Sequence, residues 1–270
     1  MHSVKPKKSL GQHFLNDHAI AERIAGTLDA FSQYPVLEVG PGMGMLTHYL
    51  LEREKDLKVV EIDWDSVAYL REHYPQLNER IIEDDFLQLD LSALFDTPFC
   101  VIGNYPYNIS SQIFFKVLDY KNLVPCCTGM IQKEVAERLT ASPGNKTYGI
   151  LSVLLQAWYN IEYLFTVDEK AFTPPPKVKS AVIRLTRNKR EKMNCNEKLF
   201  KRVVKTSFNM RRKMLRNSVK PLLSVTNGEV LQQPIFTQRP EQLSVGEFEE
   251  LTNMLEPFIV SANKEQSQNK

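Results

Sequence analysis

Hydrophobic positions follow two alternating spacings between about residues 36 and 187. Short, continuous apolar runs, typical of buried strands, are separated by longer stretches in which apolar residues recur every three or four positions, as in amphipathic helices. The predicted strands are 36–39, 58–62, 80–83, 99–102, 127–131, 161–167 and 181–186. The predicted helices are 17–28, 46–53, 66–73, 111–118, 133–140 and 149–158. This alternation predicts a mostly parallel seven-stranded α/β sheet, with the last two strands as an antiparallel edge hairpin.

The strand pattern ends near residue 188, and the rest of the chain has helical spacing only. Basic amphipathic helices are predicted at 197–208 and 211–223, and a third helix at 245–259. The final residues are polar and without periodicity, as is typical of disordered segments. We therefore predict a Rossmann-like α/β domain at 1–187, a smaller all-α domain at 188–260 and a disordered tail at 261–270.

Charge is distributed unevenly along the chain. Residues 184–220 contain fourteen Lys or Arg and only two Glu, so the rest of the chain is net acidic, although the formal net charge is +2. Such a block is typical of a solvated helix face or of a phosphate-binding surface, and its strength favours nucleic acid. The candidate phosphate contacts are Arg211, Arg212, Lys213 and Arg216, with Lys5, Lys7 and Lys8 as a second basic group.

Three protein classes are disfavoured by composition. No apolar stretch approaches the ~18 to 20 residues needed to span a bilayer. The basic N-terminus does not lead into an apolar core, unlike a secretory signal, so we predict a cytoplasmic protein without membrane contact. The four cysteines form neither a CxxC pair nor a Cys/His cluster, so we expect buried free thiols, with no zinc site and no disulfide framework.

A glycine-rich turn, residues 38–44, follows the first predicted strand and leads into a helix. Gly40 and Gly42 let the backbone approach a ligand closely, beside the free amides of a helix N-terminus. About 20 residues further on, Glu61 ends the second strand, where a carboxylate accepts from ribose hydroxyls. Met45 stands where a dinucleotide fingerprint requires Gly or Ala, which favours S-adenosylmethionine over NAD.

The third strand ends in a second acidic site, Asp84-Asp85-Phe86. A carboxylate at this position can accept from an adenine amino group, beside an aromatic ring able to stack. The alternative for both carboxylates is a helix cap or a turn. Three successive strand ends together indicate one ligand that contains adenosine.

The fourth predicted strand runs into Asn104-Tyr105-Pro106-Tyr107. The Asn104 amide oxygen and a main-chain carbonyl at Tyr105 or Pro106 can both accept from one exocyclic amino group, while Tyr107 stacks on its ring. Phe172, which precedes three prolines, is a candidate for the opposite face of that ring. The alternatives are an ordinary strand-end turn for the tetrapeptide and a core position for Phe172.

With these features in place, the chain resembles the ribosomal RNA adenine dimethyltransferase family over nearly its whole length. The segments that carry the resemblance are 9–15, 39–47, 104–111, 172–178 and 208–217. The resemblance implies that His13 and Leu15 flank S-adenosylmethionine with Gly40. It implies that Glu61 holds the ribose, Asp85 addresses the adenine, and Asn104 lies between cofactor and target base.

Two positions depart from the family's commonest forms. His13 stands where Asn is frequent, which leaves the role of its side chain open, but Leu15 and the backbone can serve the cofactor regardless. Tyr105 stands where a smaller aliphatic residue is usual, and we expect it to change how tightly the acceptor pocket closes.

The function implied by the resemblance is methylation of the N6 amino groups of two adjacent adenosines. Their implied position is a 3′-terminal hairpin loop of 16S rRNA in the small (30S) ribosomal subunit, and the implied role is in ribosome biogenesis. We expect a monomer that uses no metal. A 23S rRNA methyltransferase of the antibiotic-resistance type, a DNA adenine methyltransferase and an RNA-binding assembly factor with dispensable catalysis remain as alternatives. The basic helical domain argues against the 23S rRNA enzyme, and the lack of a separate sequence-reading module argues against the DNA enzyme. The intact cofactor motifs argue against a factor with dispensable catalysis.

Overall fold

The computed structural model describes residues 4–53, 56–224 and 228–259, and the chain divides into two compact units. The first unit comprises Met1–Glu137 and Trp158–Asn188, and the second comprises Arg138–Ala157 and Lys189–Lys270. The second unit therefore includes Arg138–Ala157, which the sequence analysis placed in the first domain. The tail predicted at 261–270 lies outside the described residues.

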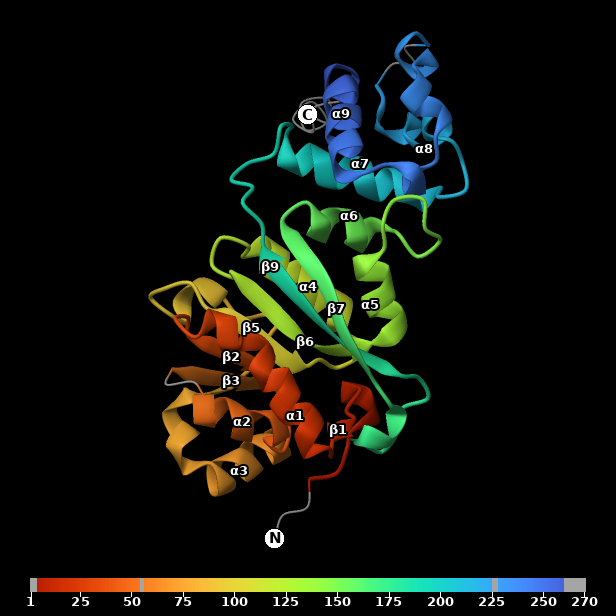
Figure 1. Cartoon of the computed structure of the whole chain (residues 1–270). Coiled ribbons are helices and arrows are strands. Elements are labelled where there is room, and N and C mark those ends of the chain that lie inside the picture. Colours follow the sequence, from red (N-terminus) through yellow and green to blue (C-terminus); the bar gives the residue numbers. More distant parts are fainter. Residues whose placement is uncertain (1–3, 54–55, 225–227, 260–270) are drawn as a thin grey trace, which may run out of the picture. The chain divides into compact units, whose positions relative to one another are not determined.

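A seven-stranded sheet with the order β4-β3-β2-β5-β6-β9-β7 forms the centre of the first unit (Figure 1). Its strands are β2 (Val36–Val39), β3 (Leu57–Glu61), β4 (Ile81–Glu83), β5 (Cys100–Asn104), β6 (Cys126–Gln132), β7 (Tyr159–Val167) and β9 (Ser180–Arg187). β4, β3, β2, β5 and β6 pair in parallel, whereas β9 is antiparallel to both β6 and β7. The predicted mostly parallel sheet with a terminal antiparallel hairpin is thus confirmed. Within the hairpin, β7 forms the edge of the sheet, and β9 lies between β7 and β6.

In the part of the chain that the structure describes, five α-helices lie in the first unit or at its boundary, and the second, third and fourth of them connect parallel strands of the sheet. They are α1 (His18–Ala25), α2 (Met45–Arg53), α3 (Trp64–His73), α4 (Ser110–Asp119) and α5 (Lys133–Thr140), and the boundary between the units falls within α5. Buried apolar residues of the strands and of α1 and α2 form the core of this unit, as the continuous apolar runs predict. A short pair, β1 (Phe14–Leu15) with β8 (Phe172–Thr173), joins the N-terminal residues to the segment before β9.

The second unit is helical, as predicted. It contains α6 (Ile150–Gln156), α7 (Glu197–Asn209), α8 (Leu215–Ser218) and α9 (Val245–Leu255). The helix predicted at 211–223 is wrong, because residues 210–213 form a turn, which is followed by the short α8 and a 3-10 turn at Lys220–Leu222. The amide of Leu215 donates to the carbonyl of Gln238 instead of to a carbonyl one turn earlier in its own segment, and Pro221 lacks an amide hydrogen.

All four cysteines are free, with three of them buried and Cys195 partly exposed. Within the described ranges, no helix is long and apolar enough to cross a membrane. Among the same residues, no group of three or more His, Cys, Asp or Glu side chains is placed to hold a metal ion.

Candidate active site

A cavity of about 510 Å³ opens at the carboxyl ends of β2, β3 and β5 in the first unit. This is the edge of a parallel sheet at which α/β proteins bind ligands. Strand ends form one side of its lining, and the N-terminal segment, residues 10–15, contributes the other. The structure brings together there the predicted residues His13, Leu15, Gly40, Gly42, Glu61, Asp85, Asn104, Tyr105, Pro106 and Tyr107.

The glycine-rich turn is built as the sequence predicts. Gly40 and Gly42 have φ angles of 69° and 56°, in the left-handed region that favours glycine. A Cβ atom at Gly42 would lie 3.0 Å from the Phe14 ring of the N-terminal segment. A side chain at Gly42 would therefore both strain the turn and push Phe14 out of the cavity wall.

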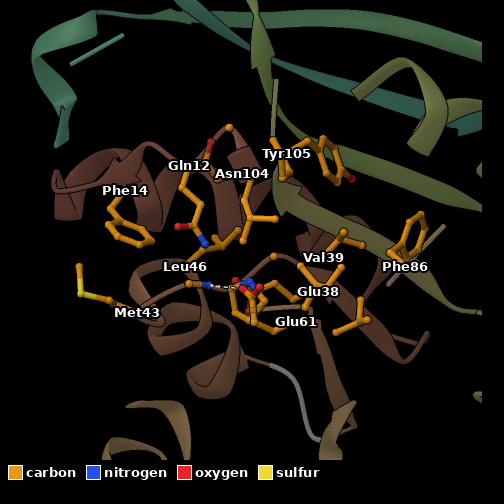
Figure 2. Close-up of a pocket in the computed structure, with 18 of the residues that line it drawn as sticks. Gln12, Phe14, Glu38, Val39, Met43, Leu46, Glu61, Phe86, Asn104 and Tyr105 are labelled. Carbon is orange, nitrogen blue, oxygen red and sulfur yellow. Dashed lines mark hydrogen bonds between the residues drawn. The ribbon is translucent and has the colours of Figure 1, made fainter. Parts of the chain in front are cut away.

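Glu61 fastens this turn to the end of β3. Its carboxylate accepts from the amide of Gly42 at 3.1 Å and from the amide of Asp63 at 2.9 Å, and the residue is 5% exposed. Burial raises the pKa of Glu61, and the backbone hydrogen bonds oppose that rise. Glu61 lines the cavity, where its carboxylate can accept from a ligand hydroxyl (Figure 2).

Glu38 is a wall residue to which the sequence analysis gave no role. It is 1% exposed and accepts from the hydroxyl of Thr47 at 2.7 Å. Burial is the main cause that raises the pKa of Glu38 to about 8, so the carboxyl is largely neutral at pH 7. The sequence feature that could have identified Glu38 as a functional candidate is a charged residue inside an otherwise apolar strand.

The sequence analysis also missed Asp63, which ties the N-terminal residues to β3. The ammonium of Lys7 forms ion pairs with Asp63 and Asp65, and the Gln12 amide donates to Asp63 at 3.1 Å. Burial opposes ionisation of Asp63, but the hydrogen bonds from Lys7 and Gln12 outweigh it and lower its pKa. Lys7 is therefore occupied by carboxylates, which weakens its candidacy as a phosphate contact.

The acidic residues after β4 form their own turn. Asp84 accepts from the amide of Asp85 at 2.7 Å, and Asp85 accepts from the amide of Leu87 at 2.9 Å. Both carboxylates thus make the turn contacts that the alternative interpretation predicts. Both residues also line the cavity, beside the buried ring of Phe86, so an adenine contact for Asp85 stays a prediction.

Asn104 ends β5 inside the cavity. Its side-chain amide nitrogen donates to the carbonyl of His13 at 3.0 Å. Because that bond fixes which end of the amide faces the N-terminal segment, the Oδ1 atom remains as an acceptor for another group. This orientation is the one that the predicted contact with an amino group requires.

Tyr105 points away from the cavity (Figure 2). It is 1% exposed, and its hydroxyl donates to the carbonyl of Thr128 at 2.7 Å. Its ring lies against Gly103 and Gly129, where added Cβ atoms would be 2.9 Å and 2.8 Å from it. The structure therefore gives the Tyr105 side chain a core position, and only its main chain has access to an acceptor pocket.

Tyr107 is held at both its hydroxyl and its ring. The hydroxyl lies 2.5 Å from Oγ of the buried Ser180, and the ring stacks on the His13 imidazole with centroids 5.3 Å apart and planes at 28°. Phe172, the other predicted stacking residue, is 3% exposed in the core cluster and is not among the residues that line the cavity. Its pairing with Leu15 across β1 and β8 gives it the core role that was the alternative.

The basic residues of the second unit differ in their availability. Arg211 donates to the Glu241 carboxylate at 3.0 Å and to the carbonyls of Asn145 and Lys146. Arg212, Lys213 and Arg216 are exposed. Arg211 thus supports the local fold, and the exposed three remain candidate contacts for phosphate.

Comparison with known sequences finds ribosomal RNA methyltransferases that match nearly the whole chain. A family model described as "Ribosomal RNA adenine dimethylase" matches residues 3–256. A protein of Parabacteroides distasonis named "Ribosomal RNA small subunit methyltransferase A" is 68% identical over 252 residues, covering 93% of this chain and 94% of the relative. A protein of the same name from Bacteroides fragilis is 64% identical over 260 residues, covering 96% and 95%.

Solved structures give the same fold. The structure titled 23S rRNA methyltransferase ErmE is 27% identical, with a TM-score of 0.63, and covers 90% of this chain and 99% of that one. A dimethyladenosine transferase from Plasmodium falciparum is 24% identical, with a TM-score of 0.77, and covers 91% and 98%. These likenesses, together with the strand order, confirm the predicted Rossmann-like methyltransferase fold.

Proposed function

Since this chain belongs to the ribosomal RNA adenine dimethylase family, we propose that it methylates two adjacent adenosines of 16S rRNA. The reaction transfers methyl groups from S-adenosylmethionine to their N6 amino groups, in a 3′-terminal hairpin loop of the small ribosomal subunit. The observation that carries this proposal is the Asn104 amide, held by the His13 carbonyl so that its oxygen is the acceptor on the cavity side.

The residues around the cavity fit S-adenosylmethionine. The glycine turn leaves main-chain space that a Cβ atom would fill, Glu61 supplies carboxylate oxygens for ribose hydroxyls, and Asp85 lies beside the Phe86 ring for an adenine. His13 and Leu15 would flank it from the N-terminal segment. When bound, this cofactor supplies an electrophilic methyl group on a sulfonium centre.

The protein's own task is to make the target amine nucleophilic. Its lone pair is delocalised into the adenine ring, and two acceptors for its hydrogens favour a pyramidal nitrogen with a directed lone pair. The Oδ1 atom of Asn104 is one acceptor. The Pro106 carbonyl already accepts from the amide of Ile109 at 3.2 Å, so we assign the Tyr105 carbonyl as the second.

Positioning supplies much of the remaining rate. The reacting atoms must lie about 3 to 3.5 Å apart and in line, which a base stacked on the anchored Tyr107 ring satisfies most readily. In this scheme no side chain acts as a nucleophile and no metal takes part. The same pocket must accept a monomethylated amine as its second substrate.

We further propose that the second unit docks on the RNA. The exposed Arg212, Lys213 and Arg216 provide charges for successive phosphates, whereas Arg211 holds the turn that presents them. The enzyme would act as a monomer in the cytoplasm, on the small subunit during ribosome biogenesis.

Labelled S-adenosylmethionine and ribosomal subunits that lack the modification test this function. We expect label on two neighbouring adenines of 16S rRNA in small subunits and none on large subunits, with Asn104→Ala as the inactive control. Label confined to 23S rRNA would instead support the activity named for the ErmE structure. Subunit binding without methyl transfer would support an assembly factor.

A further inference from the structure

We propose that the side chain of His13 gates the acceptor site, and that the target adenine takes the place of its imidazole ring against Tyr107. This inference rests on the function proposed above. It adds an acceptor-side role for the side chain of a residue that the sequence analysis placed only beside the cofactor.

The imidazole covers a face of the ring on which the adenine would stack. The two ring centroids lie 5.3 Å apart with planes inclined by 28°, and Nδ1 of His13 is 2.8 Å from the carbonyl oxygen of Pro174. Carbon atoms in van der Waals contact lie about 3.5 to 4.0 Å apart, so two rings on either side of a base must be about 7 to 8 Å apart. The observed spacing is too small for a base to enter between them, so one ring must move.

His13 is the ring that can move. The Tyr107 hydroxyl is 2.5 Å from Oγ of Ser180, a residue with no exposed surface at the start of β9. Among the residues that the structure describes, the His13 ring has one hydrogen bond, to the carbonyl of the exposed Pro174. Rotating the His13 side chain therefore breaks an exposed contact, whereas rotating Tyr107 breaks a partly buried one.

The main chain of His13 can stay in place while its ring rotates. The His13 carbonyl accepts from Asn104 at 3.0 Å, and the next two residues pair with β8. Removal of the ring therefore leaves the backbone acceptor that orients Asn104. The His13 ring forms the gate, and the His13 carbonyl orients the Asn104 amide. Replacing His13 with alanine therefore removes the first function and keeps the second.

A gate of this kind reduces apparent affinity for the substrate. When only the open fraction of molecules can bind, the apparent dissociation constant rises in inverse proportion to that fraction. A stacked aromatic pair of this type shifts the equilibrium by roughly two- to tenfold. The penalty is the same for every base, so it is offset only by a base that stacks well on tyrosine, such as a purine extruded from its helix.

The test compares His13→Ala with His73→Ala. His73 is a matched control, since it also stacks on a tyrosine, Tyr69, and its Nδ1 also lies near a carbonyl oxygen, but it is not among the cavity-lining residues. We expect His13→Ala to lower the KM for small subunits by roughly two- to tenfold, and His73→Ala to leave the KM within twofold of wild type. An increase in KM would make His13 a stacking wall and not a gate, and an unchanged KM would also overturn the proposal.

A binding measurement keeps the gate testable apart from the methyl transfer. The protein is saturated with S-adenosylhomocysteine and titrated with N6-methyladenosine 5′-monophosphate, while the imidazole signals of His13 and His73 are followed by NMR. Displacement from Tyr107 removes its ring current, so the His13 signals should move downfield while the His73 signals stay in place. No movement, or a further upfield shift, would overturn the gate. Displacement in a protein that methylates neither subunit would retain the gate and refute the proposed function.

Discussion

Replacement of Glu61 by alanine should weaken cofactor binding directly, in addition to any effect of the substitution on the stability of the fold. The lost contact is a charge-assisted hydrogen bond to a ribose hydroxyl, which contributes about 1.5 to 3 kcal/mol. At about 1.4 kcal/mol per tenfold change, the dissociation constant for S-adenosylmethionine should rise by roughly 10- to 150-fold.

The same substitution has a cost in stability that can be worked out from its two backbone partners. The amides of Gly42 and Asp63 both lose their acceptor, and an unpaired buried amide costs about 1 to 3 kcal/mol. Removal of a carboxylate whose pKa is raised by burial offsets part of this loss. Glu61→Gln keeps one acceptor oxygen, so we expect it to be the more stable variant and still to bind the cofactor weakly.

Isothermal titration calorimetry with S-adenosylmethionine and S-adenosylhomocysteine measures the first effect, and urea unfolding measures the second. Glu83 is a matched control, because it is the register partner of Glu61 on β4 but is exposed and pairs with Arg71. Glu83→Ala should leave affinity unchanged and alter stability by at most about 1 kcal/mol. A folded Glu61→Ala protein that binds the cofactor within twofold of wild type would refute the ribose assignment.

Three further outcomes are expected. Asn104→Ala should lower single-turnover methyl transfer by at least about 100-fold with cofactor affinity within a few-fold, and near wild-type transfer would remove Asn104 from the acceptor site. Glu38 has a folded pKa of about 8, above its unfolded value, so the unliganded protein should lose stability as pH rises from about 4.5 to 8, by up to about 1.4 kcal/mol per pH unit. In urea unfolding, the Glu38→Gln variant should be more stable than wild type at pH 8.5 but not at pH 5. An equal difference in the free energy of unfolding at both pH values would contradict the buried neutral carboxyl. Replacing Arg212 and Lys213 with alanine should reduce the slope of log affinity for subunits against log salt by roughly 1.4 to 1.8. Arg211→Ala should instead lower the melting temperature with little change in that slope, and the reverse pattern would exchange the two roles.

Local patterns predicted those parts of the site that depend on local chemistry. The turn at Gly40 and Gly42, the carboxylate of Glu61 and the strand end at Asn104 each follow from residue type and position in a β-α unit. The positions of Phe172 and Tyr105 depend instead on partners far along the chain. Phe172 is buried because it pairs with Leu15, and spacing within one segment carries no information about such a contact.

The basic segment shows the same limit for helices. Its amphipathic spacing predicted a helix at 211–223, but the amide of Leu215 donates to the carbonyl of Gln238. Arg211 likewise engages Glu241 and carbonyls of the 138–157 segment. Tertiary hydrogen bonds to residues 23 or more positions away outweigh local helix propensity here.

The packing of Tyr105 limits how this acceptor site can change by substitution. A Cβ atom on Gly103 would lie 2.5 Å from the carbonyl oxygen of Val39, and one on Gly129 would lie 2.2 Å from that of Gly103. Neither glycine can therefore grow to fill the space that a smaller residue at position 105 would leave. Because the main chain of Tyr105 directly follows Asn104, a void behind that ring would loosen the acceptor geometry itself. Substitutions that repack the space behind Tyr105 therefore change thermal stability and methyl-transfer activity together. A variant selected for one of these properties must also be tested for the other.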